Sequence, residues 1–146
     1  MNHDHYSDGY IRDILESTKT IALVGASNKP ERASFRVLNF LLEKGYTVYP
    51  INPGQAGNEI AGRKVYASLA DLPEQVDMVD VFRNSESAGA VVDETLALPT
   101  LPKVIWLQLG VRNDEAAARA EAKGIKVVMD RCPKIETPRL ASLGAS

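Results

Sequence analysis

The chain has 146 residues, of which 45% are hydrophobic and 25% charged, as is typical of one globular domain with its own core. Its formal net charge of −2 gives no support to nucleic acid or an anionic membrane as a partner. The single cysteine, Cys132, excludes an internal disulfide framework, and the N-terminus lacks the basic and apolar regions of a signal peptide. No apolar run approaches the ~18 residues that span a bilayer, so we expect a cytoplasmic protein.

Residues 7–17 carry the pattern of a first helix. Ser7 is placed to cap it, and Ile11, Ile14 and Leu15 share one face at helical spacing. His3 and His5 precede this helix, and no further ligands stand near them. We therefore expect a frayed, solvated terminus and no metal site.

A short apolar strand, Thr20–Val24, comes next. A small-residue turn follows it, and a helix is predicted from Ser34 to Lys44 with Gly45 closing it. This strand–turn–helix unit is where α/β folds bind phosphates, because backbone N–H groups at the helix start point outward and the helix dipole favours an anion.

The rest of the chain alternates strands with helices. Further strands are predicted at Tyr46–Ile51, Lys64–Tyr66, Asp77–Phe82, Lys103–Leu107 and Ile125–Met129, and helices from Asn84 or Ser85 to about Leu98 and from Asn113 to Lys123. Residues 54–63 are expected to form an extended loop. The alternation predicts one α/β domain over residues 1–146, with a core over about 20–138 and a loose tail over 139–146.

The predicted architecture is a doubly wound, Rossmann-like, mostly parallel sheet of about five to six strands with helices on both faces. Ligands of such sheets lie outside the carboxyl ends of the strands. A dinucleotide site there usually has a Gly-x-Gly-x-x-Gly turn and an acidic residue after the second strand. Here the turn has only Gly25, and Asn52 follows the second strand, which argues against NAD.

Positive charge gathers near the first turn. Lys29, Arg32 and Arg36 lie just before or within the second helix. They suit a ligand with several phosphates, although Lys29 and Arg32 could equally be solvated loop charges. Arg36 points outward by helical spacing and is expected to be a bystander.

The sequence resembles a known family in several segments. These are Val24-Gly25-Ala26-Ser27-x-x-Pro30, Gly45-Tyr46-x-Val48-x-Pro50-x-Asn52-Pro53, Val81-Phe82-Arg83, Val104-Ile105-Trp106-x-Gln108-x-Gly110 and Asp130-Arg131-Cys132. In this order they look like the CoA-binding domain of ADP-forming acyl-CoA synthetases and of the succinyl-CoA synthetase alpha subunit, and like small stand-alone bacterial CoA-binding proteins.

The resemblance implies that coenzyme A or an acyl-CoA lies extended across the strand ends. The turn and the pantetheine side together give these expected cofactor-binding residues: Gly25, Ala26, Ser27, Asn28, Lys29, Pro30, Arg32, Asn52, Pro53, Gly54, Gln55, Phe82, Arg83, Leu107, Gln108, Gly110 and Cys132. The synthetases have a lysine after the matching Pro-Gly, where this chain has Gln55.

No catalytic constellation is predicted. The synthetases use a phosphorylated histidine, and this chain has only His3 and His5. Cys132 is either a small apolar side chain at a strand end or a thiol able to form a mixed disulfide with CoA. Trp106 is expected to be a strand side chain, and Asp77 and Asp80 face opposite sides of a strand, so they cannot pair.

Three interpretations of function remain open. The first is a stand-alone module that binds CoA, with a possible protein partner and no chemistry of its own. The second is an enzyme: a small NAD(P)-dependent oxidoreductase, or a CoA-transfer fragment that needs a partner. The third is a folded domain that has lost its ligand.

Overall fold

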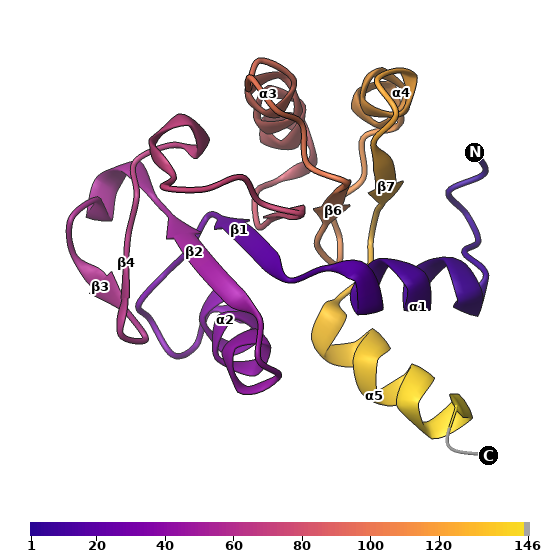
Figure 1. Cartoon of the computed structure of the whole chain (residues 1–146), viewed down its shortest axis with the longest axis horizontal. Helices are drawn as coiled ribbons and strands as arrows, with labels where there is room; N and C mark the ends of the chain where they lie inside the picture. Colours follow the sequence, from indigo (N-terminus) through magenta and orange to yellow (C-terminus); the bar gives the residue numbers. More distant parts are fainter. Residues whose placement is uncertain (145–146) are drawn as a thin grey trace.

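A five-stranded parallel sheet forms the centre of the computed structural model, which describes residues 1–144 (Figure 1). The strand order is β2-β1-β5-β6-β7, and a separate two-stranded antiparallel sheet pairs β3 with β4. The elements in chain order are α1 (Asp8–Ser17), β1 (Thr20–Val24), α2 (Ala33–Glu43), β2 (Thr47–Ile51), β3 (Glu59–Ile60), β4 (Arg63–Lys64), β5 (Met78–Val81), α3 (Ser85–Leu96), β6 (Val104–Leu107), α4 (Asp114–Ala122), β7 (Lys126–Val128) and α5 (Pro133–Gly144).

Helices cover both faces of the sheet, which confirms the doubly wound α/β prediction. In Figure 1, α3 and α4 lie on one face, and α1, α2 and α5 on the other. Each face has its own apolar core, because successive strand residues point to opposite sides. Ile105 packs toward α3 and α4, whereas Trp106 packs toward α1, α2 and α5. Trp106 is fully buried in its strand, as predicted.

Both edges of the parallel sheet are closed. At β2, the backbone of Tyr66 bonds to Pro50 and Asn52, adding an isolated parallel bridge. At β7, tyrosine side chains take this role. The Tyr10 hydroxyl accepts from the Val127 N–H at 3.2 Å, and the Tyr6 hydroxyl accepts from the Met129 N–H at 2.8 Å. Unpaired strand edges invite association with other chains, so these bonds stabilise the free domain.

The C-terminal residues correct the prediction of a loose tail. Residues 133–144 form helix α5, and residues 145 and 146 lie outside the described part of the chain. Two features of the sequence obscured the helical pattern: Pro138 lies inside the helix, and the buried residue Glu136 is acidic. Arg139 pairs with that carboxylate at 2.9 Å, which allows it to be buried beside Leu140.

The N-terminus and the loop after β2 also differ from the predictions. His3 is only 8% exposed and bonds to Tyr6 and Glu121, so the terminus is not frayed there, although His5 is exposed as expected. Residues 54–63 include strand β3 and the start of β4, which form a hairpin in place of a plain loop. Among residues 1–144, no helix has the length and apolar character needed to cross a membrane.

Candidate functional site

A groove of about 600 Å³ lies at the carboxyl ends of β1, β2, β5 and β6. It is lined by residues from the turns that follow these strands and from the start of α2. Of the predicted ligand-binding residues, the groove brings together Gly25, Ala26, Ser27, Lys29, Arg32, Asn52, Gln55, Phe82, Arg83 and Gln108. It also includes residues that we did not predict: Ala33, Ser34, Asn84, Leu109 and Val111.

The other predicted residues lie outside this lining: Asn28, Pro30, Pro53, Gly54, Leu107, Gly110 and Cys132. Leu107 and Cys132 are buried in the two apolar cores. With its side chain 7% exposed in the core beneath α1, α2 and α5, Cys132 fits the interpretation as a small apolar residue and not that of a thiol facing CoA.

The turn after β1 is built around Gly25. Its φ is +90°, which L side chains rarely adopt, and a Cβ there would stand 2.3 Å from the Phe82 carbonyl oxygen. The N–H groups of Gly25 and Ala26 both donate to the Ile51 carbonyl, at 3.0 and 3.2 Å. The turn therefore uses these two N–H groups to join β1 to β2, and they are not available to a phosphate.

Two free backbone donors lie at the start of α2. The Ala33 and Ser34 N–H groups have no acceptor in the described part of the chain, and the helix has no side-chain cap. By contrast, α3 is capped by the Asn84 side chain at 2.7 Å and α4 by Asn113 at 3.0 Å. Of these three helix starts, α2 is the one with donors left for an anion.

The groove is positively charged. Lys29, Arg32 and Arg83 line it, all three are exposed, and none forms an ion pair with a described carboxylate. No described lining residue is acidic. Arg36 lies outside the groove, where its guanidinium donates to the Glu31 carbonyl at 2.8 Å, in keeping with its expected bystander role.

Two amide side chains in the groove have opposite roles. Asn52 braces the turn: its Nδ2 donates to the Ala26 carbonyl at 2.8 Å and its Oδ1 accepts from the Gly54 N–H at 2.9 Å. Gln108 is only 6% exposed, and its buried Oε1 has no partner. A buried amide atom without a partner is costly, so Gln108 is a candidate to bond a ligand.

Asp80 is another buried polar group that stands out. Sequence reasoning considered it only as unable to pair with Asp77 and missed its complete burial. It is fully buried in β5 between Leu23 and Trp106 of the neighbouring strands, and neither carboxyl oxygen has a partner. Burial raises the pKa of Asp80 well above its ordinary value, which favours the neutral acid. Asp80 does not line the groove. Asp77 faces the other way and accepts from the Lys19 and Thr20 N–H groups, which confirms that the two carboxylates do not pair.

A second hollow, of about 660 Å³, lies between α1 and α5 beside Tyr46. Its charged lining residues, Arg12 and Glu16, have opposite signs, so it lacks the positive character of the groove. Within the described residues, no cluster of three or more His, Cys, Asp or Glu side chains could hold a metal ion. The groove at the strand ends is therefore the candidate site.

Residues 19–138 match the family model of the CoA binding domain. The chain belongs to this family. Among family relatives, it is 38% identical over 129 residues to the uncharacterized protein YneT of Bacillus subtilis, covering 88% of this chain and 93% of that protein.

The family also includes parts of larger enzymes. The chain is 34% identical over 86 residues to the alpha subunit of ADP-forming acetate–CoA ligase I of Pyrococcus furiosus, but the match covers 56% of this chain and only 19% of the subunit. Among solved structures, a hypothetical protein from Pyrococcus horikoshii OT3 superposes with a TM-score of 0.87 at 40% identity, covering 96% of each chain. The family domain thus occurs both as a small chain of this length and as a fraction of a ligase.

Proposed function

We propose that this chain is a stand-alone cytoplasmic module that binds coenzyme A or an acyl-CoA and carries out no chemistry by itself. The observation that carries the proposal is the charge of the groove, which has three cations and no described carboxylate. Membership of the CoA binding domain family supports the same ligand.

The phosphates of CoA would lie at the start of α2. CoA carries a diphosphate and a 3′-phosphate, so it needs several donors and cations in one place. Lys29 and Arg32 stand beside the free N–H groups of Ala33 and Ser34. Such a combination of cations and helix N–H groups stabilises phosphate. With Asn52 after β2, no carboxylate repels a phosphate near the ribose or provides the usual NAD contact.

The pantetheine arm would extend toward β5 and β6. Phe82 offers an apolar surface there, and the buried Oε1 of Gln108, which has no partner in the free protein, would accept a hydrogen bond from an amide N–H. Pantetheine has amide groups that can donate to Gln108 and aliphatic segments that can pack against Phe82. Bound ligand would then satisfy a polar group that is unpaired in the free protein.

Calorimetry and thermal shifts with a ligand series test the proposal. CoA should bind most tightly, 3′-dephospho-CoA more weakly and pantetheine least, and CoA binding should weaken as salt screens the cations. A ligand that binds only the native state raises the unfolding temperature as its concentration exceeds Kd. Stronger stabilisation by NAD or NADP than by CoA would replace the proposal with a dinucleotide function.

A charge-neutralised variant locates the phosphates. Lys29→Gln combined with Arg32→Gln should weaken CoA at least about tenfold, since hydrogen bonds to charged groups contribute about 1.5–3 kcal/mol each. Pantetheine binding should not change. Lys19→Gln combined with Lys123→Gln removes two positive charges at exposed positions outside the groove and is the matched control. Equal loss in both variants would show only a general charge effect.

A further inference from the structure

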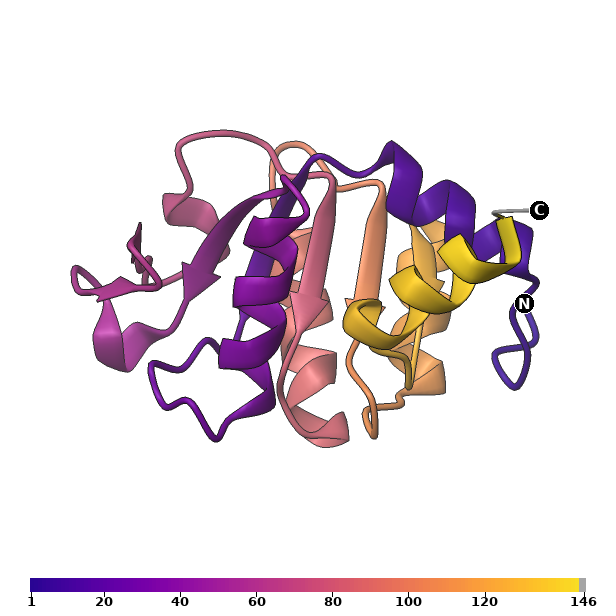
Figure 2. The ribbon, with the colours of Figure 1, turned by 90° about the horizontal axis from the view of Figure 1, so that it is seen from below.

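The N-terminal segment, residues 2–6, contacts the loop between β6 and α4 that forms one wall of the groove. It lies along the edge of β7, next to α4 (Figure 2). His3 anchors it: Nε2 lies 2.9 Å from the Glu121 carboxylate of α4 and Nδ1 lies 2.6 Å from the Tyr6 hydroxyl. We propose that Asp4 and Tyr6 are positioning residues, which hold the Gln108–Val111 wall of the groove in the shape that binds ligand. This inference rests on the proposed function of the groove.

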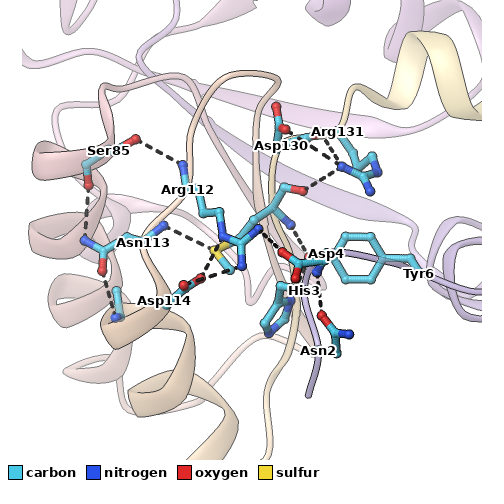
Figure 3. Close-up of polar contacts among 12 residues, drawn as sticks. Asn2, His3, Asp4, Tyr6, Ser85, Arg112, Asn113, Asp114, Asp130 and Arg131 are labelled. Atoms are coloured by element: carbon cyan, nitrogen blue, oxygen red, sulfur yellow. Dashed lines mark hydrogen bonds and ion pairs between the residues drawn. The ribbon is translucent and has the colours of Figure 1, made fainter.

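The first connection is direct. Asp4 accepts from Arg112 Nη1 at 2.7 Å, and Figure 3 shows the two side chains facing each other. Arg112 follows the groove residue Val111. Its guanidinium also bonds to Asp114 at 2.9 Å, and its backbone N–H donates to the Ser85 hydroxyl at 3.0 Å. Arg112 therefore joins the N-terminal segment to the starts of α3 and α4.

The second connection runs through the end of β7. The Tyr6 hydroxyl accepts from the Met129 N–H, and the Arg131 guanidinium lies over the Tyr6 ring at 5.0 Å from its centroid. These contacts flank Asp130, which has a φ of +57°, a conformation that is uncommon for a residue other than glycine. Tyr6 thus contacts the residues on both sides of this uncommon backbone conformation.

Asp130 in turn fixes the groove wall. Its Oδ1 accepts from the Gly110 N–H at 2.7 Å, and its own N–H donates to the Val111 carbonyl at 3.1 Å. Within the wall, the Val111 N–H donates to the Gln108 carbonyl at 2.8 Å. The path from Tyr6 to Gln108 therefore runs through hydrogen bonds between described residues and the peptide bond that joins Met129 to Asp130.

Tyr10 and Asp8 provide matched controls. The Tyr10 ring stacks on that of Tyr6 with centroids 5.7 Å apart, and its hydroxyl also bonds to β7, but at Val127. Asp8 forms an exposed ion pair of 2.8 Å, but with Arg139 of α5. Tyr10 and Asp8 thus make the same kinds of contact as Tyr6 and Asp4, a hydroxyl bond to β7 and an exposed ion pair with an arginine, but they do not contact the β6–α4 loop.

The experiment compares two full-length double variants, Tyr6→Phe with Asp4→Asn and Tyr10→Phe with Asp8→Asn. Amide hydrogen exchange of Gly110 and Val111 reports on the wall without any ligand, and calorimetry with CoA reports on the site. We expect the first variant to speed exchange of these amides about tenfold and to weaken CoA about threefold to tenfold. The control should change either quantity less than twofold, and restoring the carboxylate with Asp4→Glu should recover part of the loss.

The outcomes separate this inference from the proposed function. Equal exchange at Gly110 and Val111 in the two double variants would overturn the positioning role. If the wild-type protein does not bind CoA, the proposed function is wrong, and the exchange comparison still decides whether the N-terminal segment orders the wall. Faster exchange with unchanged CoA affinity would also overturn the role, because the wall would then not matter to binding.

Discussion

The groove differs from the hydrogen-bond network that the N-terminal segment, residues 2–6, forms with α4 and the β6–α4 loop. The difference lies in whether their polar groups have partners. In the network, Asp4, Arg112 and Asp114 bond to one another, and His3 is held between Tyr6 and Glu121. In the groove, the cations, the helix N–H groups at the start of α2 and the amide of Gln108 have no described partner. Paired groups connect the elements of this fold, whereas unpaired groups gather at the strand ends, where the proposed ligand would bind.

The largest predicted effect tests the close contact between the turn after β1, at Gly25, and the turn after β5, at Phe82. Gly25→Ala should lower the free energy of unfolding by about 3 kcal/mol, because it adds a clash with the Phe82 carbonyl to the cost of a left-handed side chain. Gly45 has a similar φ of +92°, but a Cβ added there would have nothing within 4 Å, so Gly45→Ala should cost only about 1 kcal/mol. Urea unfolding measures both, and equal losses would show that the clash is absent.

The second prediction concerns Asp80, an unpaired polar group that is fully buried in the core and does not line the groove. Because burial raises its folded pKa, folded Asp80 keeps its proton to a higher pH than the unfolded chain, whose pKa is near the ordinary 3.8. Its contribution to stability is therefore greatest below pH 3.8 and falls by about 1.4 kcal/mol per pH unit as the pH rises to the folded pKa.

Asp80→Asn removes that titration. The stability of the variant relative to wild type should rise with pH from about pH 4 and level off at the folded pKa of Asp80, as measured by urea unfolding across the pH range. CoA affinity at a fixed pH should stay within about twofold, because the side chain does not line the groove. Parallel pH curves for the two proteins would show that Asp80 does not titrate as its burial requires.

The third prediction separates stability from binding at Gln108. Gln108→Met should stabilise the free protein by about 1 kcal/mol, because it removes a buried amide atom that has no partner. The same change should weaken CoA about fivefold, since the ligand loses an acceptor. Gln55→Met, in a more exposed part of the same groove, should give no comparable gain in unfolding temperature. A loss of stability in Gln108→Met would mean that the amide is satisfied in solution.

The smallest predicted effect belongs to the paired surface charges. Arg119→Gln breaks the ion pairs with Asp93 at 3.1 Å and Glu115 at 2.9 Å, yet both carboxylates are well exposed and the Arg119 side chain is itself 36% exposed. Exposed pairs contribute little, so the free energy of unfolding should fall by no more than about 0.5 kcal/mol. A larger loss in urea unfolding would show that α3 and α4 depend on this link more than on their apolar contacts.

Local patterns in the sequence determined most of the elements and the position of the site. Apolar strands alternating with capped helices required a doubly wound sheet, and such a sheet places the turns after its strands at one edge. Ser7 and Asn113 cap their helices as predicted, and of the two candidates Asn84 and Ser85 the structure has Asn84 as the cap, because capping depends only on residues within one turn. Of the turn residues expected to bind ligand, Gly25, Ala26, Ser27, Lys29 and Arg32 do line one groove with Phe82, Arg83 and Gln108, whereas Asn28 and Pro30 do not.

Only the tertiary structure decided which polar groups in that groove are free. The sequence predicted phosphate donors at the start of the second helix, and the N–H groups of Ala33 and Ser34 there have no described acceptor. It did not predict that the N–H groups of Gly25 and Ala26, in the expected binding turn, both donate to Ile51. Helix α5, the buried His3 and the sealed Asp80 were likewise invisible, because each depends on partners or neighbours distant in the chain. Local periodicity predicts where an element lies, but hydrogen-bond satisfaction depends on contacts between elements, and these exist only in the folded chain.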